Sequence, residues 1–132
     1  MSEIRTNLAR AKLHQGEAVS VISGNMTSEI IDFLGTMGFD AAWIECEHGP
    51  VSWEQISDMT RACDLWGLSS ITRVNSNDPG LITRTLDRGS MGIVVPHVST
   101  REAAEKAMMS AKFAPLGYRG MFGGRQSYGV PD

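Results

Sequence analysis

The feature that most constrains the fold of this chain is a repeat of about two dozen residues, in which a short β-branched segment precedes a segment with helical periodicity. Alternating strands and helices predict a parallel sheet with right-handed crossovers, either as an open doubly wound sheet or as a closed barrel. The strands are expected at residues 18–23, 41–45, 69–73 and 91–95.

Capping residues mark the limits of the helices between these strands. A polar helix is expected first, over residues 3–14, and Gly38, Gly67 and Gly89 each end a later helix. The residues expected to open the helices after the four strands are Ser28, Ser52, Pro79 and Thr100.

The turn after the first strand separates the two candidate folds. A dinucleotide-binding sheet normally carries G-x-G-x-x-G there, whereas residues 23–28 contain a single glycine. The sequence therefore favours a (β/α)₈ TIM barrel. Such a barrel takes about 250 residues and eight units, and only four are visible in 132 residues. We expect an α/β fold in which residues 1–132 supply roughly the first four βα units, the N-terminal half of one barrel domain.

Composition narrows the classes of partner. A hydrophobic fraction of 42%, a net charge of −3 and evenly spread basic residues are typical of a globular protein and predict neither a nucleic-acid nor a membrane partner. No apolar run is long enough to span a bilayer, and the polar first residues do not resemble a signal peptide, so a cytoplasmic protein is expected. Cys46 and Cys63 are expected to be reduced thiols.

Polar residues follow the strands at the end where a barrel places its chemistry. Glu45, Glu47 and His48 follow the second strand, Arg73 the third and His97 the fourth. The two carboxylates, the guanidinium and one or both of the imidazoles are expected to converge on a candidate active site. A structural interpretation also exists, in which Arg73 only neutralises the two glutamates and His48 bonds to backbone.

Three further residues are ambiguous by pattern alone. Asp87 lies in the last turn of its helix, where the helix dipole disfavours an acid, which suggests a partner. A solvated surface aspartate is an equal alternative. His97 and His14 are expected to be structural or surface residues.

Four segments in order, residues 38–50, 72–75, 86–96 and 114–120, resemble the HpcH/HpaI family of class II, metal-dependent pyruvate aldolases. The likeness runs from about residue 7 to residue 129. It implies that His48 is the acid/base acting through a metal-bound water, that Asp87 forms a dyad with it, and that Arg73 contacts the carbonyl and enolate oxygen of the pyruvate unit.

The resemblance also implies a divalent metal, Mg²⁺, Mn²⁺ or Co²⁺. Its ligands follow the fifth and sixth strands in the family and are therefore expected outside this chain, while Glu45 and Glu47 act around the metal without binding it. Two positions depart from the family pattern. Glu45 stands where many members have aspartate, and His97 stands where an apolar residue is usual.

The implied function is reversible retro-aldol cleavage of a 4-hydroxy-2-keto acid to pyruvate and an aldehyde, by a homo-oligomer acting on a small 2-keto acid. No lysine follows a predicted strand, so a Schiff-base mechanism has no candidate. The 132-residue chain alone is expected to be inactive. The alternatives are a related acyl-CoA lyase, or a non-catalytic half-barrel that only binds a keto acid or dimerises.

Overall fold

The structure, a computed structural model, describes residues 5–121 and shows the expected alternation of strands and helices. A short 3₁₀ helix, η1, leads directly into α3. The elements in order are α1 (Leu8–His14), β1 (Val21–Ile22), α2 (Ser28–Gly35), β2 (Ala41–Glu45), η1 (Trp53–Gln55), α3 (Ile56–Leu65), β3 (Ser69–Arg73), α4 (Pro79–Asp87), β4 (Gly92–Val94) and α5 (Arg101–Ala111).

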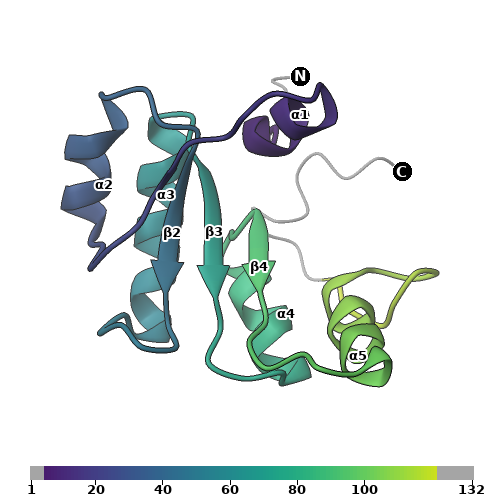
Figure 1. The fold of residues 1–132 in the computed structure, drawn as a ribbon. Helices are drawn as coiled ribbons and strands as arrows, with labels where there is room; N and C mark the ends of the chain where they lie inside the picture. Colours follow the sequence, from purple (N-terminus) through teal and green to yellow (C-terminus); the bar gives the residue numbers. More distant parts are fainter. Residues whose placement is uncertain (1–4, 122–132) are drawn as a thin grey trace.

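The strands form one parallel sheet in the order β1-β2-β3-β4. Figure 1 shows the labelled strands pointing the same way, with α1 at their amino ends and the connecting loops at their carboxyl ends. In a doubly wound sheet the strand order reverses at a switch point, and no reversal occurs here. Sequential right-handed crossovers put the helices on one face, which is the arrangement of a barrel wall. The chain supplies the first four βα units of a TIM barrel.

Several element limits differ from the sequence expectation. β2 and β3 lie as predicted, whereas β1 and β4 are shorter. Helix α1 starts only at Leu8, because the side chain of Asn7 accepts the Arg10 N–H and caps it; residues 3 and 4 of the predicted helix lie outside the described part. Thr27, not Ser28, caps α2 by accepting the Ile30 N–H.

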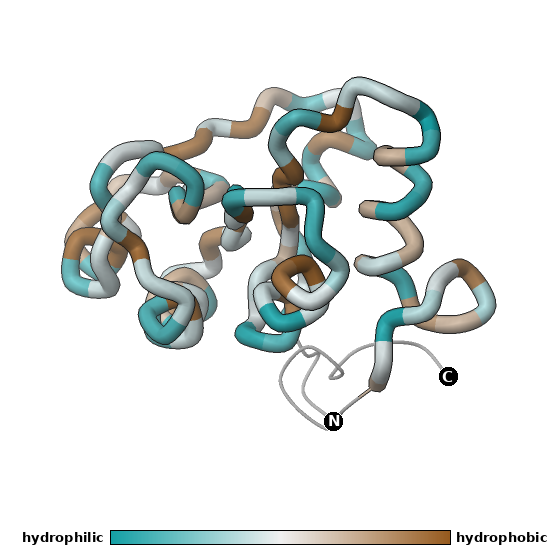
Figure 2. The backbone as a smooth tube through the Cα atoms, turned by 90° about the horizontal axis from the view of Figure 1, so that it is seen from below, coloured by the Kyte–Doolittle hydropathy of each residue, from teal (hydrophilic) through white to brown (hydrophobic). Residues whose placement is uncertain are grey.

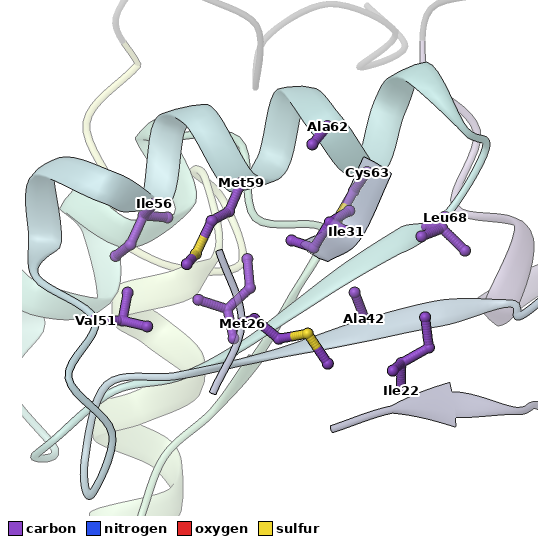
Figure 3. Close-up of a cluster of buried hydrophobic side chains, with 11 residues drawn as sticks. Ile22, Met26, Ile31, Ala42, Val51, Ile56, Met59, Ala62, Cys63 and Leu68 are labelled. Atoms are coloured by element: carbon purple, nitrogen blue, oxygen red, sulfur yellow. The ribbon is translucent and has the colours of Figure 1, made fainter. Parts of the chain in front are cut away.

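Residues of each strand point alternately to the two faces of the sheet. Ala42 and Ile44 of β2 face the helices, where they belong to the main hydrophobic core between the sheet and helices α2 and α3 (Figure 3). Trp43 and Glu45 therefore face the opposite side, which is the interior of a barrel. The buried members of this core are Ile22, Met26, Ile31, Ala42, Ile44, Val51, Ile56, Met59, Ala62, Cys63 and Leu68.

A second, smaller core lies beneath α4 and α5. Val74, Ile82 and Leu86 form its buried part. Viewed from the carboxyl ends of the strands, hydrophilic and hydrophobic residues are interspersed along each helix, as expected for helices that pack on one side only (Figure 2). Helices α2 and α3 pack together, as do α4 and α5.

The amino ends of the strands are closed by α1. The backbone N–H of Ala9 donates to Ser69 Oγ at 3.1 Å, and Ser69 Oγ donates to Asn7 Oδ1 at 3.0 Å. Within residues 5–121, no helix is long and apolar enough to cross a membrane, and neither Cys46 nor Cys63 is in a disulfide. The loops at the opposite ends of the strands are not covered by α1 and carry Glu47, His48 and His97.

Candidate active site at the carboxyl ends of the strands

The strand register places the candidate residues in one row at the carboxyl edge of the sheet. Glu45 pairs with Arg73 across β2 and β3, and Arg73 pairs with Val94 across β3 and β4. Paired residues in parallel strands share a face, so Glu45 and Arg73 both point to the barrel interior. The expected convergence of these two side chains is present.

Glu45 is the centre of the cluster. Its Oε2 atom accepts from Arg73 Nε at 2.7 Å and from the indole of Trp43 at 2.9 Å, and lies 2.7 Å from Arg73 Nη2. Its Oε1 atom accepts the backbone N–H groups of Glu47 at 2.7 Å and His48 at 3.0 Å. One carboxylate thus fixes both the guanidinium and the loop that carries His48.

These contacts keep Glu45 ionised. Burial acts to raise the pKa of Glu45, but hydrogen bonds from Arg73, Trp43 and two backbone N–H groups outweigh it and hold the pKa at about 2. The hydrogen bond to Glu45 in turn raises the pKa of Arg73. The guanidinium is therefore a permanent, oriented positive charge.

Glu47 connects the guanidinium with both histidines. Its carboxylate is only 9% exposed, with Oε2 3.2 Å from Arg73 Nη1 and 3.7 Å from His48 Nε2. Its Oε1 atom lies 3.1 Å from His97 Nε2. The imidazole of His48 is 74% exposed, which leaves it accessible to a small molecule. His97, expected to be a structural or surface residue, is exposed and contacts Glu47 at the site.

The guanidinium retains hydrogen-bonding capacity. Arg73 has five N–H donors, and three contacts to Glu45 and Glu47 account for the Nε group and one direction of each terminal nitrogen. Arg73 does neutralise the two glutamates, as the structural interpretation expected. These contacts to Glu45 and Glu47 involve three of the five N–H donors.

Gly49 makes the tight turn of this loop possible. A Cβ atom at this position would lie 2.6 Å from the carbonyl oxygen of Glu45 and 3.1 Å from its Cγ. Any side chain at Gly49 would therefore push the loop away from β2. The turn holds His48 beside the cluster.

Trp43 is a further residue of the site, and the sequence patterns described above did not single it out. It lies two residues before Glu45 on the same face of β2, donates to that carboxylate, and holds Arg73 Cζ 5.8 Å from its ring centroid. The signal was present in the strand alternation, since residues two apart on a strand share a face.

The structure does not bring Asp87 to His48 within one chain. Helix α4 runs from the carboxyl end of β3 to the amino end of β4, and Asp87 is its last residue. His48 follows the carboxyl end of β2, and a five-residue strand spans about 16 Å. Asp87 Oδ1 instead lies 2.7 Å from Arg119 Nη2. The predicted dyad is therefore not formed inside the chain.

The described residues do not form a divalent-metal site by themselves. Between residues 5 and 121 no group of three or more His, Cys, Asp and Glu side chains is arranged to hold a metal ion. All four carboxylate oxygens of Glu45 and Glu47 already contact protein donors. The cluster has two carboxylates for one guanidinium, a charge that suits a cation nearby, but it does not supply the coordinating ligands.

The fold and this edge define a class of protein, the (β/α)-barrel enzymes that build their sites from the loops after successive strands. The comparison with known families gives the particular one: the profile of the HpcH/HpaI aldolase/citrate lyase family matches residues 22–127, and the chain belongs to this family.

Two of the curated relatives are named as aldolases. The chain is 31% identical over 130 residues to 4-hydroxy-4-methyl-2-oxoglutarate aldolase of Chaetomium globosum, covering 98% of this chain and 47% of that one. It is 38% identical over 87 residues to 2-dehydro-3,6-dideoxy-6-sulfogluconate aldolase of Pseudomonas putida, covering 66% and 34%. The chain thus spans about a third to a half of the length of these curated relatives.

A solved structure agrees with the fold. The HpcH/HpaI aldolase of Desulfitobacterium hafniense superposes with a TM-score of 0.83 at 26% identity, over 93% of this chain and 48% of that one. The sequence-based resemblance to the family and the expected half-barrel are both confirmed.

Proposed function

We propose that the protein containing this chain is a carbon–carbon lyase that cleaves a 4-hydroxy-2-keto acid to pyruvate and an aldehyde, and catalyses the reverse addition. The observation that carries the proposal is the Arg73 guanidinium, fixed by Glu45 and Glu47 at the carboxyl edge of the sheet with His48 beside it. The named activities of the family relatives support the same reaction class.

The reaction needs positive charge at one oxygen and a proton acceptor at another. Cleavage removes the proton of the 4-hydroxyl, breaks the bond between C3 and C4, and moves that electron pair to the carbonyl oxygen at C2 as an enolate. Arg73 supplies fixed donors to that oxygen, where negative charge develops. His48 takes the 4-hydroxyl proton, the aldehyde leaves, and protonation of C3 gives pyruvate.

The pairing of His48 with Asp87, implied by the family resemblance, remains part of the proposal in a modified form. Since the two residues lie at opposite edges of the sheet, the pair would have to form between two copies of the chain. Asp87 is suited to this, because its side chain is 32% exposed and, within residues 5–121, its hydrogen bond to Arg119 uses Oδ1. The proposed assembly is therefore a homo-oligomer in which one copy completes the site of another.

We retain a divalent metal as a proposed cofactor, with ligands from outside residues 5–121, because those residues offer no ligand set. No step above depends on it. We expect the 132-residue chain alone to release no pyruvate and to bind Mg²⁺ or Mn²⁺ weakly by calorimetry. Micromolar binding with turnover would show that this segment carries ligands of its own.

The direct test is an assay of the full-length protein with 4-hydroxy-2-oxopentanoate, measuring pyruvate with a coupled dehydrogenase, with and without added Mg²⁺ or Mn²⁺. Pyruvate release is expected. Its absence for this substrate and for adducts of pyruvate with other aldehydes would contradict the proposed reaction.

A further inference from the structure

Arg119 is the least exposed cation in the ion pairs of the described residues. Its side chain is 7% exposed, and Nη2 donates to Asp87 Oδ1 at 2.7 Å. The guanidinium also lies over the ring of Phe113, with Cζ 4.6 Å from the ring centroid. The side chain of Asp87 is 32% exposed. The pair therefore joins a buried cation on the inner side to a carboxylate that reaches the surface.

The backbone that carries Arg119 is held against the carboxyl end of α5. The N–H groups of Tyr118 and Arg119 donate to the carbonyl oxygens of Met109 and Lys112, each at 3.0 Å. Gly117 has no room for a side chain, because a Cβ atom there would clash with the same two carbonyl oxygens. The guanidinium is thus fixed by backbone contacts and not only by its ion pair.

Stability alone does not account for the pair. Asp87 is the last residue of α4, where the helix dipole disfavours an acid. Burying the guanidinium of Arg119 costs desolvation energy, and a buried ion pair often stabilises a fold no better than apolar residues of the same volume. Both features are explained if the carboxylate itself is used.

The geometry of the pair suits the proposed site between two copies. A carboxylate that orients an imidazole on another copy has to be held in one orientation before the copies meet. Arg119 holds one oxygen of Asp87 from the inner side, which restricts how the carboxylate can turn. The imidazole of His48 is 74% exposed and can be reached from outside its own chain.

We propose that Arg119 is a positioning residue that fixes Asp87 for the active site of a neighbouring copy. The inference rests on the proposed aldolase function and on the proposed pair between copies, and it adds the residue that prepares that pair. In this role Arg119 acts through Asp87 and does not contact the substrate. Its loss should slow proton transfer at His48 and leave substrate binding, which depends on Arg73, largely unchanged.

The test uses the full-length enzyme and measures pyruvate release from 4-hydroxy-2-oxopentanoate. The main variant is Arg119→Gln, which removes the charge, and Arg119→Lys restores the charge without the planar guanidinium. The matched control is Arg5→Gln. Arg5 also forms a largely buried ion pair at the amino edge, with Nε 2.9 Å from Asp64 and a side chain 14% exposed. Asp64 has no proposed part in the reaction.

We expect Arg119→Gln to lower kcat about tenfold and to change KM less than about threefold, since small displacements of catalytic groups are costly. Arg119→Lys should recover part of the loss. Arg5→Gln should lower the Tm and leave kcat within about twofold of wild type. In an Asp87→Asn background, Arg119→Gln should reduce kcat no further. That double variant leaves neither partner as an unpaired charge, so it answers the question even if Arg119→Gln alone folds poorly.

Mixed oligomers test where the effect acts. Co-refolding Arg119→Gln with His48→Ala should give activity above both parents, because some sites then combine His48 of the first chain with intact Arg119 and Asp87 of the second. Co-refolding Arg119→Gln with Asp87→Asn should give no gain, because neither chain offers a fixed carboxylate.

The inference would be overturned if kcat of Arg119→Gln matched that of Arg5→Gln. It would also be overturned if mixing with His48→Ala gave no gain, or if the Arg119 and Asp87 changes lowered kcat independently. None of these results contradicts the aldolase reaction, whereas a wild-type enzyme that releases no pyruvate from this substrate or from other aldehyde adducts would contradict the proposed function itself.

Discussion

The two edges of the sheet use the same kinds of charged residue in opposite ways. At the amino edge two carboxylates each have a cation of their own: Lys12 Nζ lies 2.6 Å from Asp40, and Arg119 lies 2.7 Å from Asp87. At the carboxyl edge, Glu45 and Glu47 share one guanidinium and two exposed imidazoles.

The difference separates stability from chemistry. The ion pairs at the amino edge hold helices and loops against the sheet. Because each pair joins one cation to one carboxylate, it contributes little net charge. The carboxyl edge retains excess negative charge, spare N–H donors and accessible imidazoles, which are what a reacting substrate requires. Barrels in general place stability at the amino face and catalysis at the carboxyl face. Asp87 is the residue that tests this division, because it lies at the first face and is proposed to act at the second.

The largest expected effect comes from breaking the proposed pair between copies. His48→Ala in the full-length protein should lower kcat/KM by about 10²- to 10⁴-fold, as for a general acid/base, and Asp87→Asn should also impair it. The double variant should lose much less than the product of the single losses, because residues acting as a unit are not additive. If the double variant loses the product of the two single losses in kcat/KM, Asp87 does not act through His48, and its role is the ion pair with Arg119.

Mixing the two single variants sharpens this test. If one copy supplies Asp87 and another His48, co-refolded mixtures of His48→Ala and Asp87→Asn contain some sites with both native residues. Activity well above either parent is then expected, measured as pyruvate release. A mixture no more active than its parents would exclude a shared site.

The next effect concerns the guanidinium. Arg73→Ala should lower kcat/KM by about 10²-fold, as for loss of a donor to a developing oxyanion. The comparison is Lys12→Met at the amino edge, which breaks an ion pair away from the site and should leave kcat/KM within a few-fold of wild type. Equal kinetic losses from both changes would remove the distinction between the edges.

A smaller loss is expected from Gly49→Ala. The added Cβ would approach the Glu45 carbonyl oxygen to 2.6 Å, so the loop must move and His48 with it. We expect kcat/KM to fall about tenfold, since small displacements of catalytic groups are costly. Gly16→Ala is the control, because Gly16 lies in a turn with open space around it. Its φ of 77° means that alanine adds backbone strain there. That strain arises at the opposite edge of the sheet from the site. Unchanged kinetics for Gly49→Ala would show that the loop is adaptable.

The smallest effect belongs to the amino edge and to stability alone. The hydrogen bond from Lys12, with those from Ser20, lowers the pKa of Asp40 from 3.8 to about 2. A depressed pKa contributes stability that is present above pH of about 4 and is lost as pH falls toward 2. Asp40→Asn should therefore lower the Tm near neutral pH and reduce its dependence on pH in that acidic window. An unchanged pH profile by calorimetry would contradict this.

Much of the fold followed from local patterns. β2 and β3 lie at the predicted residues because each pairs on both sides, so the whole apolar run is held in the sheet. β1 and β4 are at the edges of the described sheet and pair on one side only, which shortens them. Thr27 and Ser28 have equivalent hydroxyls, and only the backbone geometry decides which of them caps α2.

The site was partly predictable. Arg73 and Glu45 could be placed because parallel strands end at one edge. The contact of His97 with Glu47 joins residues 50 apart in sequence, and His97 has a left-handed backbone conformation. Hydrophobic periodicity in a sequence cannot predict that a histidine adopts this conformation. For Asp87 the resemblance supplied a role without saying that the partner histidine lies out of reach in its own chain.

The sequential strand order also bears on how the protein is made. Each strand of the described sheet adds beside the one synthesised immediately before it, so none of these strands has to wait for a distant partner before it can pair. A ribosome takes about one to five seconds to synthesise two dozen residues, and local helices and short loops form in microseconds. Each of the four units therefore has time to dock on the growing sheet before the next emerges.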